Sequence, residues 1–449
     1  MKKYVFAILM TFIMVGIIII IYIFVINKKE KINVLEGIVL SYEGEELTVE
    51  DKNQTIYTFK LDKFDANIGD KIVLEYIGVL KAEKEYQNVK IIKYRVKEKL
   101  KEESPIPKEW KDKGIFSSSY IKAYEKLNEM TLDEKINQML IVRYPDNEGI
   151  NLLKEKGFGG YIFFEKDFKG KTKEEVKNLM GNLQSVSKIP ILTAVDEEGG
   201  TVVRISSNPN LSDEWFKSPR YLYSSGGFDL IKEDTIKKSK ILNDLGINLN
   251  LAPVIDVSTN PSDYMYKRSL GQNTSLTSEY AKVVIEASKE TGVSYTLKHF
   301  PGYGNNKDTH IGSSVDSRTY EDILKNDLPP FEEGIKAGAE AVLVSHNIVS
   351  SIDSANPASL SSNIHDILRK DLKFTGVIIT DDLIMDAVAS IPDVSAKAVL
   401  AGNDILITTD YERSIESIKK NLEEGILTED IINQSVFRIL SWKYEKRLL

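Results

Sequence analysis

The sequence predicts an α/β protein built around a TIM-type (β/α)8 barrel. The chain has 449 residues, which is too long for one small domain. From residue 114 to the end, short apolar runs alternate with amphipathic helical stretches. Eight such repeats in about 330 residues are typical of a TIM barrel. A doubly wound open sheet is the alternative, but no glycine-rich dinucleotide fingerprint follows any of the apolar runs.

The eight predicted strands are short and rich in branched apolar residues. They span residues 136–144, 157–164, 190–196, 247–257, 294–300, 339–346, 375–382 and 403–408. A TIM barrel places its functional residues at the carboxyl ends of its strands and in the loops that follow. We therefore expect the polar residues that end these runs to converge on one face.

The N-terminus predicts a membrane anchor. Residues 5–27 form an uncharged and almost wholly apolar run with lysines on both sides. The run is close to the ~20 residues that span a bilayer and exceeds the ~7–15 apolar residues of a cleavable signal. We interpret residues 1–27 as an uncleaved transmembrane signal anchor, with the catalytic part outside the cytoplasm. Secretion after signal cleavage is the alternative.

Residues 30–98 predict a small all-β, OB-like module. Five runs rich in Val, Ile, Tyr and Thr are separated by turn-like segments. Residues 99–113 are charged and then punctuated by proline, which is typical of a linker. The catalytic domain is expected over residues 114–449.

Composition excludes several classes of function. The net charge of -8 argues against a nucleic-acid partner, which requires a basic face. The chain has no cysteine, so disulfides, thiolate metal sites and a cysteine nucleophile are excluded.

Polar residues follow most of the predicted strands. They are Asp196 and Glu198, Asp256 and Arg268, Lys298 and His299 with Asp308 and His310 in the next loop, Ser345 and His346, and Asp381 and Asp382. Structural roles compete with functional ones at several of these positions. Asp256 and Asp382 suit a loop acceptor or a helix cap, and His346 suits a buried core histidine. His365 lies on a helical pattern and is interpreted as structural.

Four linked motifs carry a resemblance to a known family. KHFPGYG at residues 298–304, followed by Asp308-Thr309-His310, resembles the KHFPGHG…D-S-H signature of family 3 glycoside hydrolases in their β-N-acetylglucosaminidase branch. VDEEGGTVVR, LAPVIDVSTNP…RSLG and GVIITDDLIM are similar to three further motifs of that branch, in the family order. The sequence departs from the pattern at Tyr303, at Thr201 and in a loop before Asp308 that is one residue shorter.

The resemblance implies a retaining glycosidase mechanism. Asp381 matches the nucleophile, and His310 matches a histidine acid/base that is paired with Asp308. In an extended segment residues i and i+2 point to the same side, so the aspartate can orient the imidazole. An unperturbed histidine pKa of about 6.5 suits a group that first donates and then accepts a proton.

The resemblance also implies a sugar-binding set and a substrate class. The matching residues are Asp196, Arg204, Arg268, Lys298 and His299. The implied substrate is a glycan or muropeptide with terminal β-linked GlcNAc, hydrolysed without a metal or organic cofactor.

Other activities remain open at this stage. Within the family they are a β-glucosidase or β-xylosidase, and a β-N-acetylglucosaminide phosphorylase. Outside it they are a Schiff-base aldolase that uses Lys298, a metal hydrolase that uses His299, Asp308 and His310, and a wall-binding protein with a decayed barrel.

Overall fold

The computed structural model describes residues 31–81, 87, 89–98, 106–289, 291–304, 312 and 314–449. The chain divides into two compact units, Met1–Pro105 and Ile106–Leu449, which are described one after the other.

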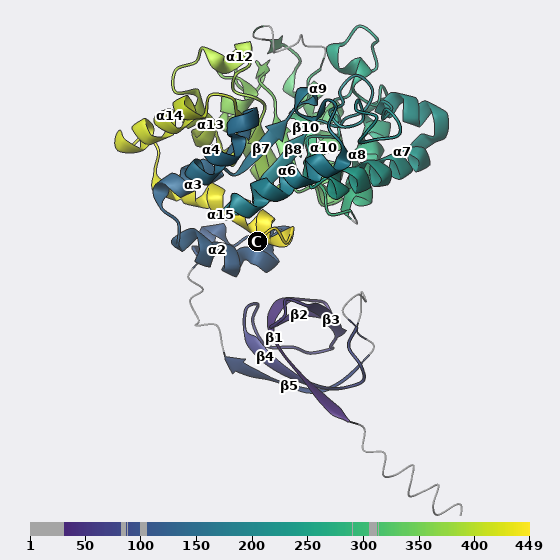
Figure 1. The fold of residues 1–449 in the computed structure, drawn as a ribbon, viewed down its shortest axis with the longest axis vertical. Coiled ribbons are helices and arrows are strands. Elements are labelled where there is room, and N and C mark those ends of the chain that lie inside the picture. Colours follow the sequence, from purple (N-terminus) through teal and green to yellow (C-terminus); the bar gives the residue numbers. More distant parts are fainter. Residues whose placement is uncertain are drawn as a thin grey trace, which may run out of the picture. The chain divides into compact units, whose positions relative to one another are not determined.

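The first unit contains one antiparallel sheet with the strand order β3-β2-β1-β4-β5, whose strands are labelled in Figure 1. Its strands are β1 (Ile32–Glu43), β2 (Glu46–Asp51), β3 (Ile56–Lys60), β4 (Lys71–Ile77) and β5 (Lys90–Glu98). Alternate residues of each strand point to opposite faces, and one face forms the core. That core consists of Leu35, Val39, Leu47, Val49, Phe59, Ile72, Leu74 and Tyr76.

The second unit contains an eight-stranded parallel sheet that curls into a nearly closed barrel (Figure 1). Its strands are β6 (Leu140–Arg143), β7 (Gly160–Phe163), β8 (Leu192–Val195), β9 (Leu249–Asn250), β10 (Ser294–Phe300), β12 (Ala341–Val344), β14 (Val377–Thr380) and β15 (Leu406–Thr408). The order is β14-β12-β10-β9-β8-β7-β6-β15. An isolated bridge between Ile379 and Ile405 joins the two end strands. Each of the eight runs predicted from the sequence therefore contains a barrel strand.

The barrel strands are buried on both faces, which explains their continuous apolar character. All seven residues of β10 and all four residues of β14 are buried. Charged residues enter these strands only near their carboxyl ends, as Arg143 does in β6 and Lys298 does in β10. The strand pattern therefore delivers charged side chains to one end of the barrel.

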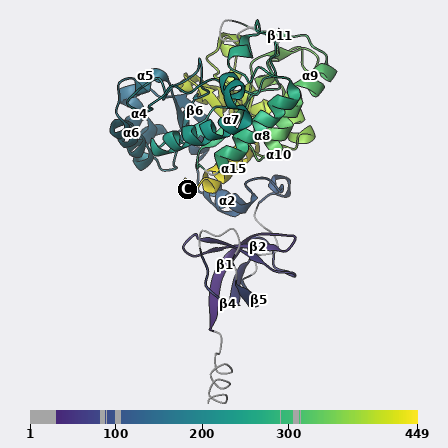
Figure 2. The same cartoon turned by 90° about the vertical axis from the view of Figure 1, so that its right-hand side faces the viewer.

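Helices surround the strands (Figures 1 and 2). They are α2 (Tyr120–Asn128), α3 (Leu132–Gln138), α4 (Gly149–Lys156), α5 (Glu165–Phe168), α6 (Lys173–Val186), α7 (Pro219–Asp244), α8 (Thr274–Lys289), α9 (Tyr320–Asn326), α10 (Leu328–Lys336), α11 (Ser362–Asp366), α12 (Asp386–Ala389), α13 (Val394–Ala401), α14 (Tyr411–Glu423) and α15 (Glu429–Glu445). Capping boxes begin α3 at Thr131, α6 at Thr172 and α9 at Thr319. A short parallel pair, β11 (Val315–Asp316) and β13 (Ile348–Val349), lies beyond the barrel strands.

The predicted transmembrane helix requires a correction. Residues 1–27 lie outside the described residues, and no helix in the described part of the chain is long and apolar enough to cross a bilayer. The longest helical stretch among the described residues, α7, is kinked at Gly227 and carries charged residues along its second part. The fold is therefore stated as α/β, with a nearly closed eight-stranded parallel sheet and a five-stranded antiparallel sheet. The predicted membrane localisation is not carried forward.

The last helix contributes a buried lysine to the barrel core. Lys443 of α15 is fully buried, and its ammonium donates to Gln138 Oε1 at 2.8 Å and to the Gly159 carbonyl at 3.0 Å. Among the described residues no carboxylate pairs with it. Burial lowers the pKa of Lys443 to about 7.

This lysine predicts a pH dependence of stability. Above pH 7 the unfolded chain keeps the Lys443 proton while the folded chain releases it, so the free energy of unfolding rises with pH. Between pH 7 and pH 9 we expect a gain of about 2 kcal/mol from this group. The gain is measured by urea unfolding followed by tryptophan fluorescence, because all three tryptophans belong to the second unit. A Lys443→Met protein with the same pH dependence as the unmodified protein would contradict the prediction.

Candidate active site

A cavity of about 710 Å³ lies at the carboxyl ends of the barrel strands. Six of the eight residues singled out from the sequence line it, namely Asp196, Arg204, Arg268, Lys298, His299 and Asp381. The other two, Asp308 and His310, lie outside the described residues.

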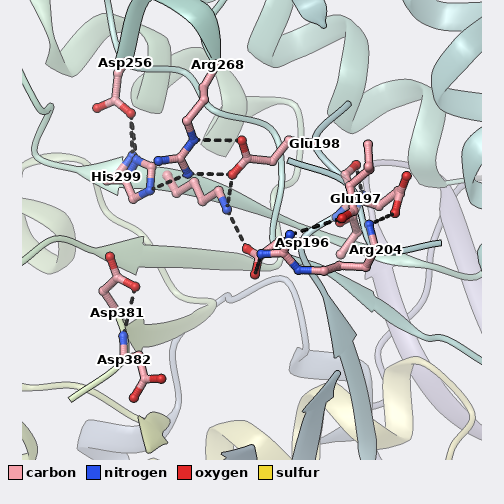
Figure 3. Close-up of polar contacts among 12 residues, drawn as sticks. Asp196, Glu197, Glu198, Arg204, Asp256, Arg268, His299, Asp381 and Asp382 are labelled. Atoms are coloured by element: carbon pink, nitrogen blue, oxygen red, sulfur yellow. Dashed lines mark hydrogen bonds and ion pairs between the residues drawn. The ribbon is translucent and has the colours of Figure 1, made fainter. Parts of the chain in front are cut away.

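A buried ion-pair network forms one wall of the cavity (Figure 3). The Lys298 ammonium lies 2.8 Å from Asp196 Oδ1 and 2.7 Å from Glu198 Oε1, and its side chain is only 3% exposed. Arg268 donates to the same Glu198 carboxylate through Nε at 2.9 Å and Nη2 at 2.6 Å. Two cations and two carboxylates, carried by β10 and by the loops after β8 and β9, therefore neutralise one another.

The cations of the network keep its two carboxylates in the ionised form. Burial alone would raise the pKa of Asp196, but the neighbouring Lys298 and Arg204 outweigh burial and lower it below its ordinary value. In the same way Arg268 and Lys298 lower the pKa of Glu198 despite burial. Both carboxylates are therefore ionised at neutral pH and act only as hydrogen-bond acceptors.

His299 is oriented by a second carboxylate. Its Nδ1 lies 2.8 Å from Asp256 Oδ2, and the Tyr303 backbone N–H donates to Asp256 Oδ1 at 2.7 Å. A carboxylate oxygen accepts hydrogen bonds, so this contact places a proton on Nδ1. Nε2 lies 3.5 Å from Arg268 Nη2. Asp256 thus fixes the orientation of the His299 ring and the position of the backbone that follows β10.

Residues 196–200, with the sequence DEEGG, combine a tight turn with a buried carboxylate. Glu197 is fully buried and accepts the backbone N–H groups of Arg204 and Ile205, each at 2.6 Å. Gly199 has a φ of 95°, and a Cβ there would lie 2.2 Å from the Lys217 carbonyl oxygen. Glu197 therefore folds the loop back, which brings Arg204 Nη2 to 3.4 Å from Asp196 Oδ2.

Asp381 follows β14 and lines the same cavity. Its backbone N–H donates to the Val344 carbonyl at 3.1 Å, and its Oδ1 accepts the Asp382 N–H at 2.9 Å. Figure 3 shows Asp381 and Asp382 separate from the ion-pair network. No cation within 4 Å pairs with the Asp381 carboxylate among the residues that the structure describes. Asp381 therefore differs from Asp196 and Glu198, whose charges are neutralised.

The two remaining described histidines are buried away from this chemistry. His346 Nδ1 lies 2.7 Å from Ser359 Oγ, and its Nε2 lies 3.1 Å from the Asp382 carbonyl. It therefore supports the turn that carries Asp381. His365 Nδ1 bonds the Ser361 carbonyl at 2.8 Å within α11.

The Arg318 guanidinium lies beside Gly304 and pairs with two aspartates, Asp316 and Asp327. Arg318 Nη1 lies 2.7 Å from Asp327 Oδ2, and Arg318 Nη2 lies 2.7 Å from Asp316 Oδ2. A Cβ at Gly304 would lie 2.6 Å from Arg318 Nη2, so glycine is required for this close approach. Burial raises the pKa of Asp327 to about 7, although Arg318 opposes the shift.

Sequence reasoning missed several residues of the site. Arg143 and Phe164 line the cavity, and the Arg143 guanidinium lies 3.9 Å above the Phe164 ring. Glu198 was noted at a strand end, but its pairing with Arg268 across 70 positions was not foreseen. The described residues contain no group of three histidine, aspartate or glutamate side chains that could hold a metal ion.

The carboxyl ends of the barrel strands thus place several carboxylates around one cavity, and glycoside hydrolases use pairs of carboxyl groups in such a site. Residues 131–442 match the glycosyl hydrolase family 3 N-terminal domain. The match covers more than half of the chain, and the chain belongs to this family.

Curated and solved proteins agree with the family assignment. The chain is 31% identical over 281 residues to a β-hexosaminidase of Nitrosomonas eutropha, covering 58% of this chain and 76% of that protein. A β-hexosaminidase of Haemophilus influenzae is 29% identical over 310 residues, with 66% and 87% covered. A solved family 3 β-N-acetylglucosaminidase from Paenibacillus sp. is 29% identical with a TM-score of 0.67. That likeness covers 71% of this chain and 63% of the solved chain.

Proposed function

We propose that the protein is a retaining β-N-acetylhexosaminidase that removes terminal β-linked GlcNAc from glycans. Relatives with this activity in their names support the reaction and the sugar. The observation that carries the proposal is the placement of Asp381. Its carboxylate lines the same cavity as the charge-neutralised network of Asp196, Glu198, Lys298 and Arg268.

Asp381 is the proposed nucleophile. A retaining enzyme needs a carboxylate that attacks the anomeric carbon and forms a glycosyl-enzyme intermediate. A carboxylate paired with a lysine or arginine is a weaker nucleophile, because the cation stabilises the negative charge that must be transferred. Asp381 has no such partner among the described residues, whereas Asp196 and Glu198 are held by Lys298 and Arg268.

The ion-pair network is the proposed sugar-binding wall. Asp196 has ionised oxygens fixed in place, and these can accept hydrogen bonds from neighbouring hydroxyl groups of the sugar. Lys298, Arg204 and Arg268 supply donors, and His299 supplies Nε2. The residues are already oriented by one another, so little ordering is needed when the sugar binds.

Asp308 and His310 are the proposed acid/base pair. This assignment rests on the motif that they share with the family. His310 would protonate the leaving oxygen and then activate water, while Asp308 would stabilise the imidazolium that forms.

A set of assays tests the proposal. The protein should release p-nitrophenol from the β-GlcNAc substrate and not from the β-glucoside, and phosphate should not increase the rate. His310→Ala should slow the hydrolysis of a GlcNAc disaccharide by about 10²–10⁴-fold, with a smaller loss for the p-nitrophenyl substrate, whose leaving group needs little protonation. Thr309→Ser is the matched control within the same motif. Faster turnover of the glucoside, dependence on phosphate, or an unaffected His310→Ala protein would contradict the proposal.

A further inference from the structure

We propose that His346 is a positioning residue for Asp381 and that it acts through the backbone of Asp382. The inference rests on the proposed function, because it concerns how the proposed nucleophile is oriented toward the anomeric carbon. His346 is not among the residues that line the catalytic cavity. Its effect on the reaction therefore passes through the residues that it holds.

The Asp381 carboxylate is held through one of its two oxygens. Oδ1 accepts the Asp382 backbone N–H at 2.9 Å (Figure 3). Within the described ranges no other group donates a hydrogen bond to this carboxylate, so Oδ2 is the oxygen available to attack the sugar. The orientation of the Asp382 N–H therefore determines where Oδ2 points.

The Asp382 backbone belongs to a short turn that follows β14. Its carbonyl accepts the Met385 N–H at 3.0 Å, and its side-chain Oδ1 accepts the Ile384 N–H at 3.1 Å. The Leu383 N–H donates to the Ile407 carbonyl of β15 at 3.0 Å. The turn is thus closed by its own bonds and attached to β15, which is one of the two strands beside β14.

His346 attaches the same turn to β12, the strand on the other side of β14. Its Nε2 lies 3.1 Å from the Asp382 carbonyl oxygen. A carbonyl oxygen only accepts hydrogen bonds, so this contact places a proton on Nε2. In the sheet, β12 lies between β14, which precedes Asp381, and β10, which carries Lys298. His346 therefore joins the turn of the nucleophile to the strand next to the proposed sugar-binding wall.

The His346 imidazole is itself fixed. Its Nδ1 lies 2.7 Å from Ser359 Oγ. The Ser359 N–H donates to the Ser345 carbonyl at 2.9 Å, and the Ser359 carbonyl accepts Asn403 Nδ2 at 2.7 Å. His346, Ser359 and Asn403 are each 0% exposed. A ring that is bonded through both nitrogens in a close-packed interior has little freedom to turn, so the position of Nε2 is set before a substrate binds.

Loss of the imidazole should affect the chemical step more than the binding of the sugar. The ion pairs of the proposed sugar-binding wall join Asp196, Glu198, Arg268 and Lys298, and they do not include His346. The nucleophile, in contrast, must lie close to the anomeric carbon and in line with the bond that breaks. A displacement of about 1 Å at such a group can lower the rate on the order of 10²-fold.

The test compares kcat with sugar affinity in the full-length protein. His346→Leu should lower kcat on p-nitrophenyl β-GlcNAc about 10²-fold, whereas the Kd for GlcNAc, measured by calorimetric titration, should stay the same. His346→Gln should keep most of the activity, because its side-chain amide can donate to the Asp382 carbonyl in place of Nε2. Ser359→Ala should lower kcat by itself and have no further effect in the His346→Leu protein, because it acts through the imidazole.

His365→Leu is the matched control. His365 is also buried, and its Nδ1 bonds the Ser361 carbonyl at 2.8 Å within α11. Both leucine variants should unfold at a lower urea concentration, but only His346→Leu should lose activity. An equal loss of kcat in the two variants, or a His346→Leu protein that loses affinity for GlcNAc as much as it loses kcat, would overturn the positioning role.

Hydrogen exchange separates this inference from the proposed function, because it requires no turnover. The exchange is followed by mass spectrometry on peptides that contain residues 382–385. In His346→Leu these amides should exchange on the order of tenfold faster than in the unmodified protein, and in His365→Leu they should not. Unchanged exchange in His346→Leu would overturn the inference. Failure of the unmodified protein on every β-GlcNAc substrate would overturn the proposed reaction, and the exchange rates would still decide whether His346 holds the turn.

Discussion

Replacement of Asp381 by Asn is expected to lower the turnover of β-GlcNAc substrates on the order of 10⁴-fold or more. The amide cannot form the glycosyl-enzyme intermediate. It can still accept the Asp382 backbone N–H that Asp381 Oδ1 accepts at 2.9 Å, so the turn after β14 should be preserved. The measurement is kcat on p-nitrophenyl β-GlcNAc, with circular dichroism and urea unfolding to establish that the variant is folded.

Two further variants test whether the loss of activity is caused by the loss of the nucleophile itself. Asp386→Asn is the matched control, because Asp386 is exposed at the start of α12 and does not line the cavity. Asp381→Ala should recover activity with azide, which attacks the anomeric carbon from the vacated side and yields the α-glycosyl azide. Residual kcat within tenfold of the unmodified protein, or a β-configured azide product, would exclude Asp381 as the nucleophile.

Replacement of Lys298 by Met is expected to lower the free energy of unfolding by about 3–5 kcal/mol. The change leaves the Asp196 and Glu198 carboxylates buried without the ammonium that lies 2.8 Å and 2.7 Å from them. Urea unfolding followed by tryptophan fluorescence measures the loss in the second unit. The exposed pair Lys237–Glu214 supplies the control, and Lys237→Met should cost less than about 1 kcal/mol.

The same change should alter how stability depends on pH. In the unmodified protein the pKa values of Asp196 and Glu198 are lowered, so their contribution is complete above the unfolded pKa values and is lost as the pH falls through the folded ones. Without Lys298 these folded pKa values rise, and the cost of the substitution should shrink as the pH falls. Lys298→Met combined with Glu198→Gln should recover part of the loss. If the loss of stability in Lys298→Met did not change with pH, or were not reduced by Glu198→Gln, the explanation by ion pairs would be contradicted.

The sequence was informative about the barrel because its strands are short, apolar and buried on both sides. Several of the strands are followed directly by a charged residue: Asp196 follows Val195, and Asp381 follows Thr380. The rule that strand ends share one face of a barrel pointed to five of the six candidate residues that line the cavity, and the sixth, Arg204, came from the motif resemblance. Their chemical roles stay predictions.

The pairings inside the site could not be predicted in this way. The Glu198–Arg268 and Asp256–His299 contacts join residues 70 and 43 positions apart, and they depend on how neighbouring strands are aligned. Glu197, which was not among the residues singled out from the sequence, is directed to backbone N–H groups of its own loop. The alternation of side chains along a strand predicts which side of the sheet a residue faces. Its contact partner on a neighbouring strand depends on how the strands are aligned, and this alignment is known only from the structure.

The proposed sugar-binding residues and the proposed nucleophile come from different parts of the barrel sheet. The proposed sugar-binding residues lie in β10 or follow β8 and β9, which are adjacent strands, whereas Asp381 follows β14, which β12 separates from β10. A protein that lacks only the reactive carboxylate should therefore keep its selectivity for glycan ends. Immobilised or labelled, such a protein would serve as a lectin-like reagent for terminal β-GlcNAc.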